Sequence, residues 1–186
     1  MSGVHAFLAP SSASTWGPGG CAAFPRMAAA FPEQEDSPAA REGEAAHWVL
    51  EQAANLGAVH VGETAPNGEA ITDEMTDGVA QMVSDIHALI ETAHVALEQP
   101  VAMPQVHGQN WGRADLVGVD MALRRVYAWD FKFGHGYVDA FENWQTFDYL
   151  VGAVNHFKVP LDDTWTFDAR IYQPRSFHAE GTLKRW

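Results

Sequence analysis

Gly112-Arg-Ala-Asp-Leu-Val-Gly-Val119 and Arg124-Arg-Val-Tyr-Ala-Trp-Asp-Phe-Lys-Phe133 are the stretch around which the chain is organised. Both segments are rich in β-branched and aromatic residues, which is typical of strands. Only the short polar link 120–123 separates them. The pattern therefore predicts a β-hairpin.

Asp115, Asp130 and Lys132 are charged side chains within this hairpin. Because side chains alternate along a strand, Asp130 and Lys132 are expected on one face, opposite Trp129, Phe131 and Phe133. If Asp115 on the first strand lies opposite that face, two carboxylates and one ammonium converge on a small volume.

That combination suits phosphoryl chemistry. Two carboxylates with open coordination positions favour a hard divalent ion such as Mg²⁺, which takes phosphate oxygens as further ligands. A neighbouring lysine can orient the attacking water or stabilise transition-state charge. The alternative is a surface hairpin with an ordinary cross-strand ion pair, since an isolated D-x-K motif is common.

Motifs outside the hairpin extend the pattern. Asp115, Asp130-Phe131-Lys132 and Gln145-Thr-Phe-Asp-Tyr149 together resemble the PD-(D/E)XK nuclease superfamily, in its RecB-like branch with a Q-x-x-x-Y helix. The run Glu42 to His47 resembles the G-x-x-x-H helix motif of the same branch. A closer likeness, to a phage and prophage family of nucleases known mainly from sequence, adds Leu8–Ala13, Trp16, Lys132–Gly136, Asn143–Gln145 and Ile171–Arg175.

The resemblance implies an α/β fold with an αβββαβ restriction-endonuclease-like core, a mixed central sheet flanked by helices. It implies catalytic roles for Asp115, Asp130, Lys132, Gln145 and Tyr149, and contacts to Mg²⁺ or Mn²⁺ from His47, Asp115, Asp130 and Phe131. The implied activity is DNA hydrolysis, as an exonuclease in phage recombination or DNA processing. Implied partners are DNA, a single-strand annealing or binding protein, and further copies of the chain.

Some of these residues have a plainer interpretation when the resemblance is set aside. His47 shares a predicted helix face with Gly43, Ala46, Leu50 and Ala54, where a histidine is more often part of the core than a ligand. Gln145 and Tyr149, four residues apart, share a face that core packing alone would explain.

Length and composition predict one globular domain, 1–186, with 47% hydrophobic residues and a loop-rich segment at 1–37. No apolar run is long enough for a membrane span and no signal-peptide pattern begins the chain, so we expect a cytoplasmic location without membrane association. Cys21 is the only cysteine. A disulfide within the chain and a four-cysteine iron-sulfur cluster are thereby excluded, and we expect Cys21 to be a small buried residue.

The net charge of −13, from 11 Lys and Arg against 24 Asp and Glu, opposes attraction to a phosphate backbone. Six basic residues fall in the last third and would form either a cationic patch or a scattered, solvated set: Arg124, Arg125, Arg170, Arg175, Lys184 and Arg185. The acidic charge motivates a second hypothesis, a catalytically inactive binding protein that mimics DNA or counters a host defence. A structural or assembly protein on the same fold is the third.

The flanking elements follow from caps and periodicity. A short helix is expected near 11–16, and Trp16 is expected to pack. Ser37-Pro38 predicts a helix over 38–56 that stops at Gly57, and a turn-rich link over 59–71 precedes a helix that starts at 72–74. The apolar stripe of that second helix comprises Met75, Val79, Met82, Val83, Ile86 and Ile90.

The remaining elements alternate strand and helix. A strand over 94–99 is expected to end at Pro100, and Glu98 on it is either a group behind the metal ligands or an exposed carboxylate at the strand end. Asp139–Glu142 has the form of a capping box that opens a third helix, in which Gly152 permits close approach. A last strand is expected over 164–172.

Overall fold

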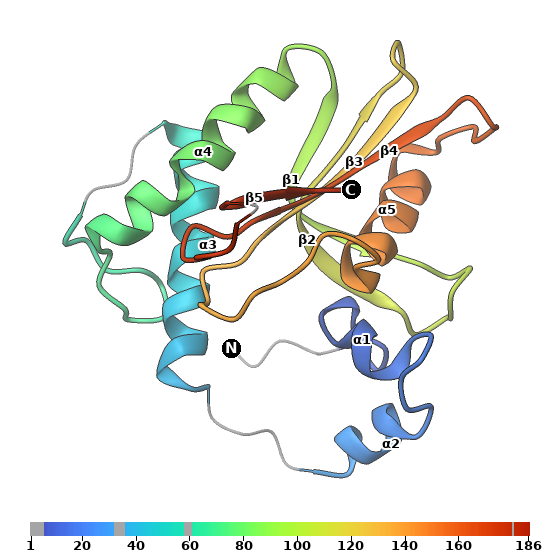
Figure 1. The fold of residues 1–186 in the computed structure, drawn as a ribbon, viewed down its shortest axis with the longest axis horizontal. Coiled ribbons are helices and arrows are strands. Elements are labelled where there is room, and N and C mark those ends of the chain that lie inside the picture. Colours follow the sequence, from blue (N-terminus) through green and yellow to red (C-terminus); the bar gives the residue numbers. More distant parts are fainter. Residues whose placement is uncertain (1–5, 32–35, 58–60, 180) are drawn as a thin grey trace.

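The computed structural model describes residues 6–31, 36–57, 61–179 and 181–186. A five-stranded mixed sheet in the order β1-β2-β3-β4-β5 lies between helices (Figure 1). The strands are β1 (His94–Ala102), β2 (Trp111–Asp120), β3 (Arg125–Phe131), β4 (Thr166–Tyr172) and β5 (Leu183–Arg185). β3 and β4 run parallel, and the other neighbouring pairs run antiparallel. The predicted hairpin and the αβββαβ order are confirmed.

Helices cover both faces of the sheet. α3 (Pro38–Leu56) and α4 (Asp73–Ile90) pack together on one face, and α5 (Trp144–Phe157) lies on the other (Figure 1). Trp129, Phe131 and Phe133 join the core under α3 and α4, whereas Val126 and Ala128 join the core under α5. The alternation expected for the second strand of the hairpin is therefore confirmed.

The two long helices on the first face begin at the predicted caps. Ser37 Oγ accepts a hydrogen bond from the backbone N–H of Ala40, and Gly57 ends α3 with a φ of 78°. Thr72 caps α4 in the same way, through the N–H of Met75. The predicted stripe of α4 is buried or half-buried, with one exception. Ile90 is the last residue of the helix and is 50% exposed.

Three strand and helix boundaries were predicted wrongly. β1 continues through Pro100, which is tolerated because β1 is an edge strand and Pro100 needs no second ladder partner. α5 begins at Trp144 with Asn143 as its N-cap, so Asp139 does not open the helix; its Oδ1 accepts from the N–H of Phe141 and shapes a turn instead. β4 begins two residues later than expected, and β5 was not predicted.

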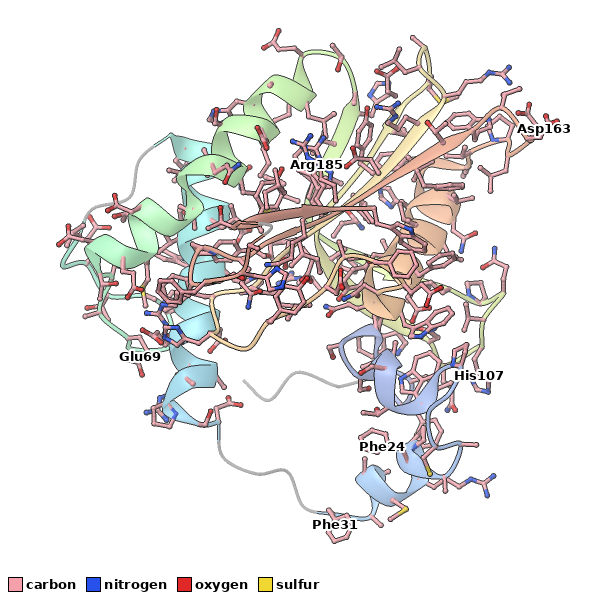
Figure 2. The ribbon with its side chains drawn as sticks, viewed as in Figure 1. Phe24, Phe31, Glu69, His107, Asp163 and Arg185 are labelled. Atoms are coloured by element: carbon pink, nitrogen blue, oxygen red, sulfur yellow. The ribbon has the colours of Figure 1, made fainter. Side chains whose placement is uncertain are left out.

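The N-terminal segment holds more helix than its composition suggests. It forms a 3-10 helix at Pro10–Ser12, α1 (Ala13–Trp16) and α2 (Phe24–Ala29), and only the first two were expected. Phe24 and Phe31 mark the α2 end of this segment, away from the sheet (Figure 2). The burial expected for Cys21 is wrong: its N–H closes a turn onto the carbonyl of Thr15, and the residue is exposed.

Two further sequence predictions concern connections and membrane association. The turn-rich link is present over 61–71, where Thr64 and Ala70 form an isolated bridge, while the start of the predicted range lies outside the described residues. Close approach at Gly152 is confirmed, because a Cβ there would lie 2.7 Å from Val101 Cβ. Among the described residues, no helix has the length and apolar character needed to cross a bilayer.

Candidate metal-dependent site

The site forms where β2 and β3 separate. Their pairing register ends at Leu116 and Trp129. Beyond this pair, Asp115 Oδ2 accepts a 2.6 Å hydrogen bond from the backbone N–H of Phe131. A buried side chain thus replaces a strand-to-strand bond. The opening places the next residues of both strands around a common space.

Side-chain alternation breaks on β2 and on its other neighbour, β1, at this level. Ala114 packs under α5 and Leu116 packs under α3 and α4, although residues two apart on a regular strand share a face. On β1, Glu98 has a φ of 45°. It lies between Leu97, which pairs with Leu116 of β2, and Gln99, which pairs with Ala114 of β2. This distortion at neighbouring positions carries Asp115 and Glu98 toward α3.

His47 meets these two carboxylates from α3. Its Nδ1 lies 3.1 Å from Asp115 Oδ1, and one ligand atom from each of His47, Glu98 and Asp115 lies within 4.8 Å of the others. The Glu98 side chain is 17% exposed and sits in mid-strand. The expectation of an exposed carboxylate at the strand end is therefore wrong, because β1 does not end before Pro100.

Asp130 is held from the α5 side of the sheet. Lys132 Nζ lies 2.9 Å from Asp130 Oδ2, and the Gln145 amide bridges the pair: its Nε2 donates to Asp130 Oδ1 at 3.0 Å and its Oε1 accepts from Lys132 Nζ at 3.0 Å. Gln145 Nε2 also lies 3.4 Å from the Tyr149 hydroxyl. Lys132 Nζ also donates a hydrogen bond to Asp130 Oδ1 at 3.2 Å. Asp130 Oδ2 is fully buried and accepts no hydrogen bond from the described residues, so the Lys132 ammonium balances this oxygen through the ion pair.

Burial and mutual attraction set the protonation of these groups. Burial raises the pKa of Asp130, and the charge of Lys132 offsets this only in part. For Asp115 burial also favours the neutral form, but the neighbouring His47 overrides it and lowers the pKa. Burial acts against a charged His47, yet the attraction of Asp115 raises its pKa to about 9. Burial, together with repulsion from Asp115, raises the pKa of Glu98 to about 7.

Solvent reaches the site from two sides. A pocket of about 240 Å³ is lined by His47, Glu98 and Arg113, and one of about 460 Å³ is lined by Lys132 and Gln145. A third pocket, of about 620 Å³, lies between α5 and β4 and has no acidic, basic or histidine side chain in its lining. His47, Glu98, Lys132 and Gln145 therefore face the two smaller pockets, whereas Asp115 and Asp130 lie in neither lining.

The structure brings the sequence-predicted residues together. His47, Asp115, Asp130, Lys132, Gln145 and Tyr149 form one connected set. Phe131 belongs to it through its backbone, because its ring is buried and packs edge-on to His47 at 5.5 Å. Glu98 joins the three-residue group as a possible ligand, which sequence reasoning did not assign. The signal was the one acidic residue of a predicted strand.

The basic residues of the last third fit neither alternative, because three of them form ion pairs and the side chains of Arg170 and Arg175 are only 15% and 9% exposed. Arg124 pairs with Asp162, Arg170 pairs with Asp168 and Asp85, and Arg175 pairs with two glutamates. Their charges are largely balanced within the protein.

Comparison with known proteins places the chain in a family. Residues 5–182 match the model of the DUF2800 family, described as a protein of unknown function, so the chain belongs to that family. A comparison with curated proteins gave no significant match.

Proposed function

We propose that this member of the DUF2800 family is a divalent-metal-dependent deoxyribonuclease of the PD-(D/E)XK type. The observation that carries the proposal is the pair of carboxylates Asp115 and Asp130 on adjacent strands, close enough for their charges to interact, with Lys132 Nζ 2.9 Å from Asp130. Gln145 joins the ammonium to the carboxylate. Asp115 also belongs to the three-residue group with His47 and Glu98, which does not include Asp130. The reaction adds water across a phosphodiester bond, leaving a phosphate on one product and a hydroxyl on the other.

The donor set fits Mg²⁺ or Mn²⁺. Carboxylate oxygens are the preferred ligands of both ions, and an imidazole suits Mn²⁺ better than Mg²⁺. Asp115 and Asp130 would hold the ion, with His47 and Glu98 beside them, and Phe131 can contribute only its backbone carbonyl. Within the described part of the chain, Asp130 Oδ2 accepts no hydrogen bond and meets only the Lys132 ammonium at 2.9 Å, so it can also donate to an ion. When bound, the ion would polarise the phosphoryl group and help to form hydroxide from water.

The protein's own groups supply orientation and positive charge. Lys132 is 27% exposed at its side chain, so it can face both Asp130 and a bound phosphate. Its ammonium can orient the attacking water or stabilise charge that develops on the phosphoryl oxygens. Gln145 holds Lys132 in place, and the backbone N–H of Phe131 holds Asp115.

The biological setting is proposed from the resemblance alone. An exonuclease in phage recombination would act in the host cytoplasm, with a single-strand annealing or binding protein or further copies of itself as partners.

An inactive acidic binding protein is the second candidate. The net charge of −13 favours it, as do Glu44 and Glu51, which line the pocket at His47. The nuclease and the binding protein differ in the side chains that each function requires at the site. Binding alone gives no reason to keep Lys132 and Gln145 around a buried carboxylate.

Incubation of end-labelled linear DNA and of covalently closed circular DNA with Mg²⁺, Mn²⁺ or EDTA tests the proposal. We expect degradation with either metal and none with EDTA, and an exonuclease would spare the circle. Absence of cleavage under all metal conditions, by protein of verified fold, would favour the binding protein.

A further inference from the structure

The pocket of about 460 Å³ next to Lys132 has an aromatic rim. Lys132 and Gln145 line it together with the rings of Tyr137, Phe141 and Trp144. Tyr137 is 44% exposed and Phe141 is 59% exposed. Large exposed rings beside a polar site mark a binding surface more often than scattered apolar residues do.

We propose that this pocket binds an unpaired nucleobase of the DNA strand next to the bond that is cleaved. The inference rests on the proposed nuclease function and specifies its substrate as a single-stranded or frayed end. A base can enter a pocket beside Lys132 only after it leaves its partner, and an aromatic side chain then replaces the lost stacking.

The rings that would take the base are already supported from behind. Phe141 packs edge-on against Trp186, with ring centroids 5.7 Å apart, and Trp144 packs against Phe147 at 5.9 Å. The contact with Trp186 leaves Phe141 exposed, so its surface stays available. Rings held in position lose little conformational entropy when a base stacks on them.

Charge determines which part of a nucleotide fits there. Asp139 and Glu142 also line the pocket, and their carboxylates repel a phosphate. The same carboxylates can accept hydrogen bonds from the exocyclic amino group of cytosine. The phosphate therefore belongs at Lys132 and the base between the rings, with amino-bearing cytosine preferred to thymine.

The shape of the carboxylate side of the pocket is set by its own hydrogen bonds. Asp139 Oδ1 accepts from the N–H of Phe141, and the Asp139 carbonyl accepts from the Asn143 side chain at 2.9 Å. These bonds fix the turn that carries Phe141. Glu142 is exposed in the same turn, which makes it the simpler carboxylate to substitute.

Binding of fluorescein-labelled oligodeoxycytidine and oligothymidine of equal length, followed by anisotropy in EDTA, tests this pocket without cleavage. Phe141→Ala should weaken binding roughly tenfold, the value of one lost base stack. Phe167→Ala is the matched control, because Phe167 is 48% exposed but lies in the separate pocket between α5 and β4. It should bind like the parent protein. Glu142→Gln should reduce the preference for cytosine.

The outcomes separate this proposal from the nuclease proposal. Unchanged affinity of Phe141→Ala, an equal loss in Phe167→Ala, or no binding by the parent protein overturns the base pocket, and the last result would favour a protein partner for the aromatic rim. Cleavage with Mg²⁺ that is indifferent to Phe141→Ala leaves the nuclease and removes the pocket. Binding that is lost in Phe141→Ala, in a protein that cleaves no DNA, supports the base pocket and removes the nuclease proposal. Equal melting temperatures of the variants exclude misfolding.

Discussion

Two clusters of opposite charges contact α3, and they differ in how completely their groups are paired. At Arg175, the guanidinium makes four hydrogen bonds of 2.7–2.8 Å to the carboxylates of Glu42 and Glu74, and it stacks 3.8 Å over the ring of Phe133. At the candidate site, Asp130 keeps a buried oxygen without a hydrogen bond.

This difference indicates different roles. A buried polar group whose hydrogen bonds are all made stabilises the fold. Among the described residues, Asp130 Oδ2 meets only the Lys132 ammonium at 2.9 Å and accepts no hydrogen bond, so it keeps a lone pair for a ligand. The Arg175 cluster ties the chain after β4 to α3 and α4. The Asp115 and Asp130 cluster retains like charges close together and shifted pKa values, as reactive sites do.

The largest expected effect is on metal binding when either carboxylate is lost. Asp115→Ala and Asp130→Ala should each remove most Mn²⁺ binding, measured by calorimetry, because each deletes a ligand. Both variants should stay folded, because relief of the repulsion between two buried carboxylates offsets part of the cost of leaving the Phe131 N–H or the Lys132 ammonium without its partner. Unchanged Mn²⁺ affinity in both variants would refute the assignment of this cluster.

Lys132→Ala should affect the rate and not the metal. Loss of a well-placed stabiliser costs about 10²–10³ in kcat, while Mn²⁺ affinity should stay equal or increase as a positive charge leaves Asp130. Lys132→Arg should not restore the rate, because a planar guanidinium does not reproduce a compact ammonium. Single-turnover cleavage at saturating Mg²⁺ measures this, and a parental rate in Lys132→Ala would favour the acidic binding protein.

His47 lies on the same helix as Glu42. It is either a metal ligand or a core residue, and two measurements separate these interpretations. As a ligand, His47→Gln should weaken Mn²⁺ binding roughly tenfold or more, with a smaller change in stability. Mn²⁺ titration and thermal melting of the same sample give both values. A large thermal loss with intact Mn²⁺ affinity would make His47 a core residue.

Arg175→Met should destabilise the fold without removing the chemistry. Hydrogen bonds to charged groups contribute about 2 kcal/mol, and the loss should appear in urea unfolding, with cleavage at saturating Mg²⁺ nearly unchanged. Arg41→Met is the control, because the Arg41–Glu69 pair is exposed on both sides and contributes less than about 1 kcal/mol. Equal losses in the two variants would contradict a special role for Arg175.

The smallest effect is the pH dependence of the difference in unfolding free energy between the parent protein and Arg175→Met. The hydrogen bond from Arg175 holds the pKa of Glu42 below its ordinary value of 4.5, so the folded state binds this proton less readily than the unfolded state. The stabilisation is then fully present above pH 4.5 and decreases as the pH falls through the folded-state pKa. In urea unfolding, the difference in unfolding free energy between the parent and Arg175→Met should become smaller in acid. A difference that does not change with pH would exclude the Glu42 carboxylate as its source.

Much of the fold follows from local signals in the sequence. Ser37, Pro38 and Gly57 define α3 to the residue because capping acts over a few neighbours. Continuation of β1 through Pro100 was missed, since whether a strand lies at an edge depends on the whole sheet. The exposure of Cys21 was missed for a local reason: its N–H closes a turn onto the Thr15 carbonyl, which the residue type does not signal.

The candidate site was predictable in its members and less so in its arrangement. Alternation along β3 places Asp130 and Lys132 together, and helical spacing places Gln145 one turn before Tyr149. Recruitment of Glu98 needs the distortion at its φ of 45°, which no residue type there signals. Pairing of Arg170 and Arg175 with distant carboxylates likewise depends on tertiary contacts.

Single-turnover cleavage of labelled linear DNA by the parent protein and by Asp130→Asn, at saturating Mg²⁺, tests the central claim most directly. The substitution keeps the size of the side chain and removes the charge that would hold the ion. We expect the rate to fall by about 10³-fold, because the ion contributes several kcal/mol to transition-state stabilisation, with an unchanged melting temperature. Equal rates for the two proteins would contradict a metal-dependent centre at Asp130.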